Sequence, residues 1–264
     1  MDKNYKEIEN AVWNDVLTEA KNIAEREPAL RILVNSAILE KSNIFEAVAS
    51  RISRRLVSLA MDYDHLYSIF CEAFEKSPEI KESLLDDLAA VRARDPACKS
   101  YIMPLLYYKG FMAITTYRVS HYLWQCGRID LAYYLQSLNS EVFAVDIHPA
   151  ARFGRGIMLD HATSFVAGET SVVEDEVSIL HEVTLGGTGN EVGDRHPKIG
   201  RGVLIGAGAK IIGNIKVGKC AKIGAGSVVL DDVAPHTTVA GIPAKPVGVA
   251  AEAEPSKTMN QKIS

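Results

Sequence analysis

The apolar positions of the first half of the chain recur at helical spacing. From Val12 to Ala24 they fall at three- and four-residue steps, which places them on one face of a helix. Pro28 follows a charged stretch and is suited to the first turn of the next helix. Asn43 and Glu46 have the spacing of a capping box before an apolar run, which predicts that a helix begins there.

Two further helices are predicted between these residues and the middle of the chain. Ser77 and Pro78 form an N-cap followed by a proline in the first helical turn, and Pro96 makes Asp95 a poor helical residue, so this helix should end there. A second helical stretch runs from about 104 to 140, with a break at Gly127. We therefore expect residues 1–140 to form a helical domain that serves packing and assembly.

The second half of the chain repeats with a period of six. Thirteen positions carry the repeat, after ten extra residues are skipped between the seventh and the eighth, and only Ser171 is not large and apolar. A second series of small or apolar residues, four places after each position, is interrupted by Glu169, Asp175 and His181. The thirteen are Ile147, Phe153, Leu159, Phe165, Ser171, Val177, Val183, Ile199, Ile205, Ile211, Val217, Ile223 and Val229.

A period of six matches neither a helix nor an alternating strand. It predicts a solenoid of short straight segments whose apolar positions point to one axis, with glycine at many of the corners. Hexapeptide repeats indicate a parallel β-helix. We expect this β-helix over residues 141–249, with an inserted loop at 188–198 and a flexible tail at 250–264.

Composition supports two architectures. Of the 19 glycines 17 follow Ile147, whereas all ten tyrosines and both tryptophans precede it. The net charge of -4 shows no basic excess, so we expect no nucleic-acid partner. The apolar runs are too short for a membrane span, and the charged first residues do not resemble a secretory signal. The four scattered cysteines are interpreted as reduced thiols in a cytoplasmic protein.

One pair of residues has the spacing of a catalytic dyad. His161 lies two residues after Leu159, and Asp146 directly precedes Ile147. The two residues are 15 positions apart, about one coil of 18 less three, so we expect them on neighbouring coils near the same corner. A carboxylate can orient a neutral imidazole as a general base. A corner hydrogen bond without catalysis is the alternative, and the spacing leaves both open.

Other polar residues are candidates for binding. Arg195 and His196 in the inserted loop can hold a carboxylate, unless the loop is merely solvated, and Asp160 can accept an ammonium group. The segment 186–189 (GGTG) lacks the Lys-Ser/Thr of a nucleotide-binding loop. The remaining histidines, His148, His181 and His236, are interpreted as structural, corner or surface residues. Lys222 and Lys245, on or after the last coils, can meet either a phosphate-rich cofactor or only water.

Taken together, these segments resemble bacterial serine O-acetyltransferases of the hexapeptide-repeat acyltransferase superfamily. The resemblance covers nearly the whole chain, and the helical domain separates this family from most hexapeptide acyltransferases. The matching segments are RARDPA near residue 95, PLLYYKGFMAITTYRVSHYLW at 104–124, VDIHPAARFGRGIMLDHAT at 145–163, VTLGGTG at 183–189, GDRHPKIG at 193–200, IGAGAKIIGNIKVG from 205 and IGAGSVV from 223.

The resemblance implies a left-handed β-helix and a reaction. The family transfers the acetyl group of acetyl-CoA to the hydroxyl of L-serine, the first step of cysteine biosynthesis from serine. His161 would take the hydroxyl proton, and Asp146 would fix its tautomer, so that the serine oxygen attacks the thioester directly without an acetyl-enzyme. No metal is implied.

The resemblance also implies how the substrates are held. Asp95 and Asp160 would hold the ammonium group of serine, and Arg195 and His196 its carboxylate. An acidic pair and a basic pair together fix the orientation of an amino acid. The positions that match the coenzyme A site are Gly187, Thr188, Ala207, Lys222 and Ala225.

Assembly and regulation are implied as well. Members of the family form trimers with the active site between subunits, and two trimers meet through their helical domains as a hexamer. In many members a terminal isoleucine docks into O-acetylserine sulfhydrylase, but this sequence reads Ile263-Ser264 at that place, which departs from the pattern. L-cysteine, nearly isosteric with serine, is a feedback inhibitor in the family.

Three alternatives compete with this interpretation. A hexapeptide acyltransferase for homoserine, a sugar or a xenobiotic would not need the helical domain together with Asp95 and the DRHP loop. A γ-type carbonic anhydrase needs three histidines at one zinc, and His161, His181 and His196 are the candidates. A non-catalytic scaffold is the third alternative, although every residue expected in the site is present.

Overall fold

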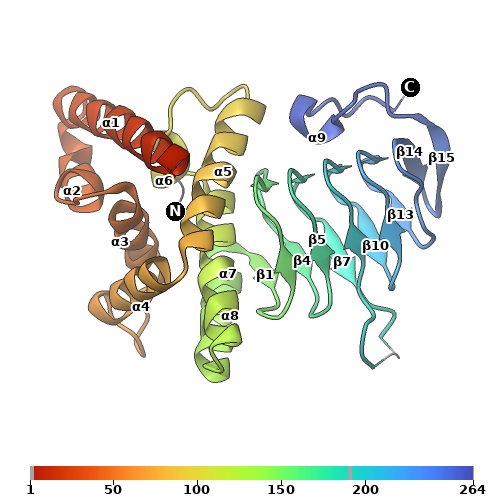
Figure 1. Cartoon of the computed structure of the whole chain (residues 1–264), viewed down its shortest axis with the longest axis horizontal. Helices are drawn as coiled ribbons and strands as arrows, with labels where there is room; N and C mark the ends of the chain where they lie inside the picture. The colour runs from red at the N-terminus through yellow and green to blue at the C-terminus, as the bar shows by residue number, and fades with distance from the viewer. Residues whose placement is uncertain (1–2, 190–191, 264) are drawn as a thin grey trace.

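The computed structural model describes residues 3–189 and 192–263, and Figure 1 shows a helical part joined to a β-solenoid. The helical part packs against the first coil of the solenoid through α5, α7 and α8. Its elements are α1 (Lys3–Arg26), η1 (Pro28–Leu30), α2 (Arg31–Val34), η2 (Asn35–Leu39), α3 (Ile44–Leu56), α4 (Tyr63–Lys76), α5 (Pro78–Arg94), α6 (Ile102–Leu106), α7 (Lys109–Gln125) and α8 (Ile129–Phe143).

The helix boundaries follow local chemistry. The Asn43 side chain accepts a hydrogen bond from the Glu46 backbone N–H at 3.0 Å, which confirms the helix start, while the Glu46 carboxylate accepts from the Ser42 backbone in place of the Asn43 backbone that a capping box would use. Helix α5 starts at Pro78 and ends at Arg94 as expected, although the Ser77 side chain makes no capping hydrogen bond. Pro28 opens a 3₁₀ turn.

The stretch from 104 to 140 breaks twice. The break at Gly127 is confirmed, since α7 ends at Gln125 and α8 begins at Ile129. A second break at Tyr107 and Tyr108 separates α6 from α7, and neither of these two positions is a glycine or a proline. This second break orients Tyr108 toward the solenoid, where it lines a cavity between the helices and the first coil.

The solenoid is a left-handed parallel β-helix with three sheets. One face has the order β1-β4-β7-β10-β13, the second β11-β8-β5-β2, and the third β15-β14-β12-β9-β6-β3. The strands are β1 (Val145–Ile147), β2 (Arg152–Phe153), β3 (Met158–Leu159), β4 (Phe165–Ala167), β5 (Val172–Val173), β6 (Ser178–Ile179), β7 (Thr184–Gly186), β8 (Lys198–Ile199), β9 (Leu204–Ile205), β10 (Lys210–Ile212), β11 (Lys216–Val217), β12 (Lys222–Ile223), β13 (Val228–Val229), β14 (Thr237–Gly241) and β15 (Ala244–Val249).

The repeat register predicted for the middle coil is wrong by two residues. Strands β1 and β4 pair as Val145↔Phe165, 20 residues apart, whereas β4 and β7 pair at a spacing of 18. Two of the ten extra residues therefore lie in the corner between β3 and β4. The remaining eight lie between β7 and β8, since Val173 pairs with Ile199 at a spacing of 26.

The error has a simple physical reason. Residues two apart in a strand point to the same side, and in the middle coil both sets are buried. Ser171 breaks the apolar pattern because it is the position two before Val173, where a small residue fits. The positions that carry the repeat there are Ala167, Val173, Ile179 and Leu185, in place of Phe165, Ser171, Val177 and Val183.

Two buried arginines join the helical part to the solenoid. Arg118 donates to both carboxylate oxygens of Asp87, at 2.8 and 3.0 Å, and to the carbonyl of Gly154 at 2.7 Å, while the Asp87 carboxylate also accepts from the Ile157 backbone. Arg94 donates to the Gly156 carbonyl at 3.0 Å. Around these ion pairs, one connected apolar cluster extends from the helices into the solenoid axis.

The C-terminal segment differs from the expected flexible tail. It forms α9 (Pro255–Thr258), whose Pro255 and Ser256 are buried against the solenoid. The Ser256 carbonyl accepts a hydrogen bond from Ser178, and Glu252 forms an ion pair with Lys222 at 3.2 Å. These polar contacts order a segment whose low apolar content had predicted disorder; Ser264 lies outside the described residues.

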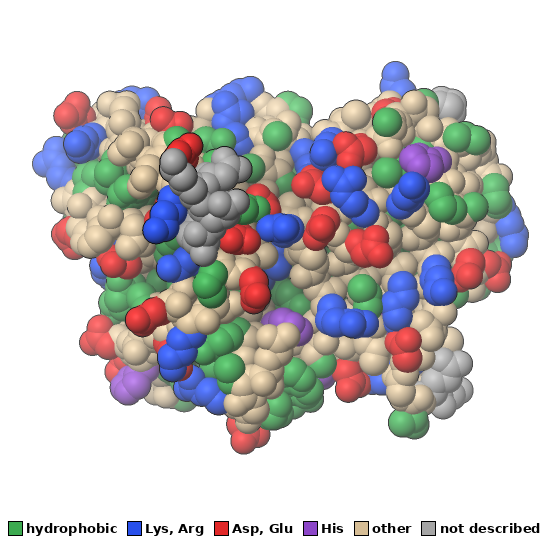
Figure 2. Space-filling model, in the orientation of Figure 1, with side chains coloured by type: hydrophobic (Ala, Val, Ile, Leu, Met, Phe, Trp, Pro, Cys, Tyr) green, Lys and Arg blue, Asp and Glu red, His purple; other side chains and the backbone are tan. Residues whose placement is uncertain are grey.

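The surface of the molecule carries charged side chains of both signs. Figure 2 shows Lys, Arg, Asp and Glu side chains interspersed over the visible face of the molecule. Within the described ranges, every helix is too short or too polar to cross a membrane. The four cysteines are free thiols in the structure.

Candidate active site

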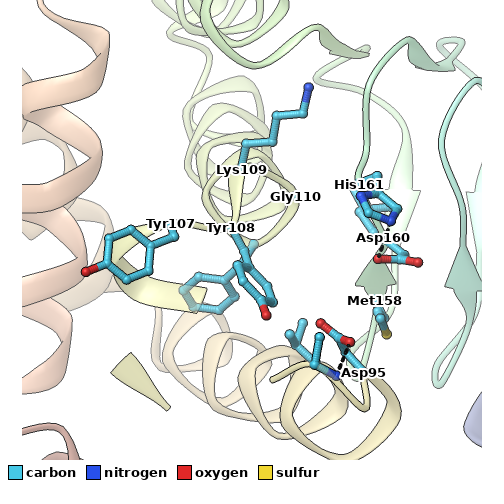
Figure 3. Close-up of a pocket in the computed structure, with 12 residues that line it drawn as sticks. Asp95, Tyr107, Tyr108, Lys109, Gly110, Met158, Asp160 and His161 are labelled. Carbon is cyan, nitrogen blue, oxygen red and sulfur yellow. Dashed lines mark hydrogen bonds and ion pairs between the residues drawn. The ribbon is translucent and has the colours of Figure 1, made fainter. Parts of the chain in front are cut away.

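A cavity of about 380 Å³ lies where the end of α5 and the start of α7 meet the corner after β3. Asp95, Tyr108, Asp160 and His161 all line it (Figure 3). The His161 side chain is 73% exposed and the Asp160 side chain 26%, and their Nε2 and Oδ1 atoms are 3.9 Å apart. The structure therefore brings three of the predicted site residues together.

The corner that carries His161 is the one with the two extra residues. His161, Ala162 and Ser164 all have positive φ, near 60°, a conformation that non-glycine residues rarely adopt. The Ala162 backbone donates to the Asp160 carbonyl and the Thr163 backbone to the His161 carbonyl, which closes the turn. The strained turn exposes His161 at the rim of the cavity.

The absence of a side chain at Gly110 lets helix α7 pack closely against this turn. A Cβ atom at Gly110, in the first turn of α7, would lie 2.0 Å from the Leu159 carbonyl oxygen. Glycine is therefore required at this position for α7 to approach the corner. The result is that Tyr108 and Lys109, just before Gly110, lie beside the candidate base.

The carboxylates of Asp95 and Asp160 lie in a cavity that apolar side chains also line. Burial raises the pKa of Asp160, while the nearby His161 opposes this shift and the negative charge of Asp95 adds to it. Burial and the charge of Asp95 raise the pKa of Tyr108 to about 12, so its hydroxyl stays protonated. Figure 3 shows this hydroxyl pointing toward Asp95. Two carboxylates next to an apolar wall favour a bound cation.

His181 occupies the corresponding corner of the next coil. It follows Ile179 by two residues, as His161 follows Leu159, and the two rings meet edge to face with centroids 5.7 Å apart. Its Nδ1 is buried without a hydrogen-bond partner among the described residues. The sequence interpretation treated His181 as a corner filler. The correct register would have placed it beside His161.

Arg195 and His196 lie in a separate cluster around the corner after β4. Arg195 pairs with Glu169 at 2.7 Å, and its hydrogen bond lowers the pKa of Glu169. His196 is 7% exposed, and burial lowers its pKa. Neither residue lines the cavity that contains His161. Sequence analysis missed Glu169 and Thr170, which hold this pair.

Asp146 is not in contact with His161 among the interactions of the described residues. It lies on β1, and its carboxylate accepts a hydrogen bond from Gln136 of α8 at 2.6 Å. Tyr133, Ser137 and Ser140 of the same helix surround it in a shallow depression. The sequence predicted that Asp146 lies near the same corner as His161. In the structure Asp146 is part of strand β1, on the flat face beside that corner.

The residues that match the coenzyme A site divide between two edges of the solenoid. Ala207 and Ala225 follow His161 and His181 along one edge, each two residues after a repeat position. Gly187 and Thr188 lie on the other edge, at the start of the inserted loop. Lys222 is buried, pairs with Glu252 and donates from Nζ to the Lys262 carbonyl at 2.9 Å, so the C-terminal segment covers it.

Comparison with known proteins matches both parts of the chain. A family model described as "Serine acetyltransferase, N-terminal" matches residues 12–116, and one described as "Bacterial transferase hexapeptide (six repeats)" matches 196–231. The serine acetyltransferase of Escherichia coli (strain K12) is 52% identical over 253 residues, covering 96% of this chain and 93% of that protein. This chain belongs to the serine acetyltransferase family.

Solved structures agree with this membership. The serine acetyltransferase of Vibrio cholerae superposes with a TM-score of 0.95 at 52% identity, covering 96% of this chain and 98% of the other. A serine acetyltransferase from Brucella abortus in complex with coenzyme A gives 0.90 at 51% identity, covering 91% and 96%. A serine acetyltransferase in complex with cysteine gives 0.93 at 51%, covering 96% and 99%. This serine acetyltransferase family member is thus an acyltransferase enzyme.

The comparisons and the structure bear on two of the alternatives raised by the sequence, a different acetyl acceptor and a zinc enzyme. The relatives are serine acetyltransferases across the length of the chain, so a homoserine or sugar acceptor is not favoured. Of the zinc-binding candidates, His161 and His181 are adjacent, whereas His196 is held at the other edge by Thr170. Over residues 3–189 and 192–263, no group of three or more His, Cys, Asp or Glu is placed to hold a metal ion.

Proposed function

We propose that the chain transfers the acetyl group of acetyl-CoA to the hydroxyl of L-serine, with His161 as the general base. The product pair is O-acetyl-L-serine and coenzyme A. The observation that carries this proposal is the exposed imidazole of His161 at a cavity lined by two carboxylates, Asp95 and Asp160. An ammonium group between the carboxylates would leave the short side chain of serine facing the imidazole.

The reaction needs one base and no covalent intermediate. His161 takes the proton of the serine hydroxyl, and the oxygen attacks the thioester carbonyl carbon. The tetrahedral intermediate collapses, the carbon–sulfur bond breaks, and the proton on His161 can pass to the departing sulfur. Asp160, 3.9 Å from Nε2, would stabilise the imidazolium that forms in this step.

Asp146 is the second proposed partner of His161. Its support is the spacing of 15 residues and its place on the face next to the His161 edge. In this structure Gln136 holds the Asp146 carboxylate, so the role requires that His161 reach it in the assembled enzyme. Comparison of Asp146→Asn with Asp160→Asn at saturating serine distinguishes the two partners, because loss of the orienting carboxylate should lower kcat, whereas loss of ammonium binding should raise the KM for serine.

The basic pair is proposed to act across a subunit boundary. Arg195 and His196 would hold the serine carboxylate, yet they lie on the edge after β4, whereas Asp95, Asp160 and His161 lie at the edge before it. A trimer would bring one edge of each copy against the other edge of its neighbour and complete the site. The same arrangement would let coenzyme A lie between Ala207 and Ala225 of one copy and Gly187 and Thr188 of the next.

Further partners follow from the same proposal. L-cysteine would compete for the serine position because it carries the same charged groups. We place the enzyme in the cytoplasm, where serine and acetyl-CoA are available, as a trimer or a hexamer of two trimers. Docking of the C-terminal segment into O-acetylserine sulfhydrylase would first require Ile263 to leave Gly224, against which it lies here.

Thiol release from acetyl-CoA tests the proposed function. The assay compares L-serine, L-homoserine and no acceptor, with wild type, His161→Ala and the control His65→Ala, an exposed histidine of α4. We expect release with serine, a loss of at least about a hundredfold in kcat for His161→Ala, and no change for His65→Ala. Release with homoserine alone, or an active His161→Ala enzyme, would contradict the proposal.

A further inference from the structure

Thr170 lies at the corner after β4 and contacts the inserted loop through all of its polar atoms. Its hydroxyl accepts hydrogen bonds from the backbone N–H groups of Arg195 and His196, both at 3.0 Å, and lies 2.9 Å from Nδ1 of His196. Its backbone N–H donates to the same Nδ1 at 3.2 Å, and its carbonyl accepts from Lys198 at 3.0 Å. One threonine thus fixes the basic pair and the residue where the loop rejoins the solenoid.

These contacts determine the tautomer of His196. A backbone N–H can only donate, so Nδ1 of His196 must accept. The Thr170 hydroxyl lies 2.9 Å from the same nitrogen, so it can also donate to Nδ1. A neutral imidazole with an unprotonated Nδ1 carries its proton on Nε2. Both hydrogen bonds that the described residues give to this ring are at Nδ1, which leaves Nε2–H free to donate to a ligand.

The surroundings keep the ring neutral and in place. Burial and the positive charges of Arg195 and Lys198 lower the pKa of His196, while Glu169 opposes them. A Cβ atom at Gly168 would lie 1.9 Å from Nε2, so the ring lies directly over this glycine. Gly187 is the other glycine beside Nε2, at 3.4 Å from its Cβ position. The donor has no hydrogen-bond partner among the described residues and lies beside Gly187, one of the positions that match the coenzyme A site of the family.

Arg195 is held by the preceding residue of the same corner. Its Nη2 donates to Glu169 at 2.7 Å and its Nη1 to the Gly193 carbonyl at 2.9 Å. Two consecutive corner residues, Glu169 and Thr170, thus hold two consecutive loop residues, Arg195 and His196. The loop keeps a fixed arrangement at this point although it is long, polar and outside the solenoid.

We propose that Thr170 is a positioning residue that holds His196 as the neutral Nε2–H tautomer and presents this donor, together with Arg195, to the carboxylate of the amino-acid substrate. This inference rests on the proposed function. It assigns His196 the role of a neutral hydrogen-bond donor, in place of a positive charge, and leaves the charge recognition to Arg195.

Kinetics of matched variants test the positioning role. Thr170→Val keeps the shape but removes the hydroxyl, Thr170→Ser restores it, and Thr237→Val is the control, since the Thr237 hydroxyl makes only a 3.4 Å contact with the Pro235 carbonyl. We expect Thr170→Val to raise the KM for L-serine by about tenfold or more with the KM for acetyl-CoA within about twofold, because misplacement by about 1 Å weakens binding steeply. For Thr170→Ser, the KM for L-serine and the KM for acetyl-CoA should each stay within about threefold of the wild-type value.

A spectroscopic measurement tests the tautomer independently. The ring nitrogens of ¹⁵N-histidine-labelled full-length protein, assigned with His196→Gln, should show His196 protonated at Nε2 and bare at Nδ1 near neutral pH. A proton on Nδ1 would overturn the inference, as would a Thr170→Val enzyme with an unchanged serine KM or with equal rises in both KM values. If Thr170→Val does not fold, Thr170→Ser and the wild-type spectrum still decide. Absence of serine-dependent thiol release in wild type would refute the proposed function, whereas the spectrum would still report on the tautomer.

Discussion

At the scale of single residues, the cavity places ionised groups where they cost stability. Burial raises the pKa of Asp160 above its value in an unfolded chain, so the folded state holds the proton more tightly. The corresponding stability is present at low pH and is lost as the pH rises through the folded-state pKa. Ionised Asp160 is thus unfavourable for the fold at neutral pH, although the proposed ammonium recognition needs its charge.

This conflict gives a prediction for Asp160→Asn. The variant should melt at a higher temperature than wild type at about pH 8, and the difference should shrink as the pH falls to about 4 and below, because Asp160 then becomes protonated in both states. Its kcat/KM for serine should fall by at least about tenfold. Calorimetry at the two pH values and steady-state kinetics measure the two effects; a lower melting temperature at about pH 8 would contradict the assigned cost.

Among the proposed site residues, sequence reasoning predicted those with distinctive chemistry and did not predict those that support them. Asp160, His161, Arg195 and His196 stand out as charged or titratable groups at corners or in the loop. Thr170 is an ordinary corner threonine, and its five hydrogen bonds depend on how an inserted loop folds back, which no local pattern encodes. The prediction placed Asp146 near His161 by counting residues along the repeat. A face and an edge of the solenoid are only a few sequence positions apart, so this count does not separate them.

At the scale of elements, the connection between α5, α7 and the first coil rests on a buried ion pair. Asp87 is fully buried and Arg118 is 7% exposed, and together they bind Gly154 and Ile157 of the first coil. Removal of one partner of a buried pair leaves the other charge uncompensated, which is costly. The pair thereby fixes the end of α5, and with it Asp95, relative to the corner of His161.

Asp87→Ala should therefore destabilise the protein by about 3–5 kcal/mol, because it leaves the Arg118 guanidinium buried without its carboxylate. The neighbouring Asp86→Ala is the control: its side chain is 31% exposed and lies 3.7 Å from Arg155, so its loss should cost at most about 1 kcal/mol. Urea denaturation monitored by circular dichroism measures both. Equal effects of the two substitutions would show that burial of the pair does not matter.

The elements themselves were largely predictable from the sequence, with two instructive exceptions. Caps and prolines marked the starts of α3 and α5, and the six-residue period marked the solenoid. The break at Tyr107 escaped prediction because neither residue there disfavours a helix strongly. The register error in the middle coil arose because Phe165 and Ala167 both point inward, so two registers satisfy the apolar pattern. Only backbone pairing separates them.

At the scale of the whole molecule, the site residues are distributed over two edges that flank one sheet. Asp95, Asp160 and His161 form one group, and Arg195 and His196 form the other. The sheet between them, β1-β4-β7-β10-β13, has outward side chains such as Val166, which is 37% exposed. Two half-sites on separate edges of the solenoid suit a cyclic assembly in which each site takes one half from each of two neighbouring copies.

Mixing of two inactive variants tests this division. His161→Ala and Arg195→Ala should each be nearly inactive alone, because each removes one half of every site. Co-assembly at equal amounts should restore about a quarter of the wild-type activity, since about one site in four receives His161 from one copy and Arg195 from a different variant copy. The double variant His161→Ala/Arg195→Ala mixed with wild type is the control, and it should give no more than the sum of its parts. Failure of the two single variants to complement, while sedimentation shows mixed oligomers, would place both residues in the site of one and the same copy.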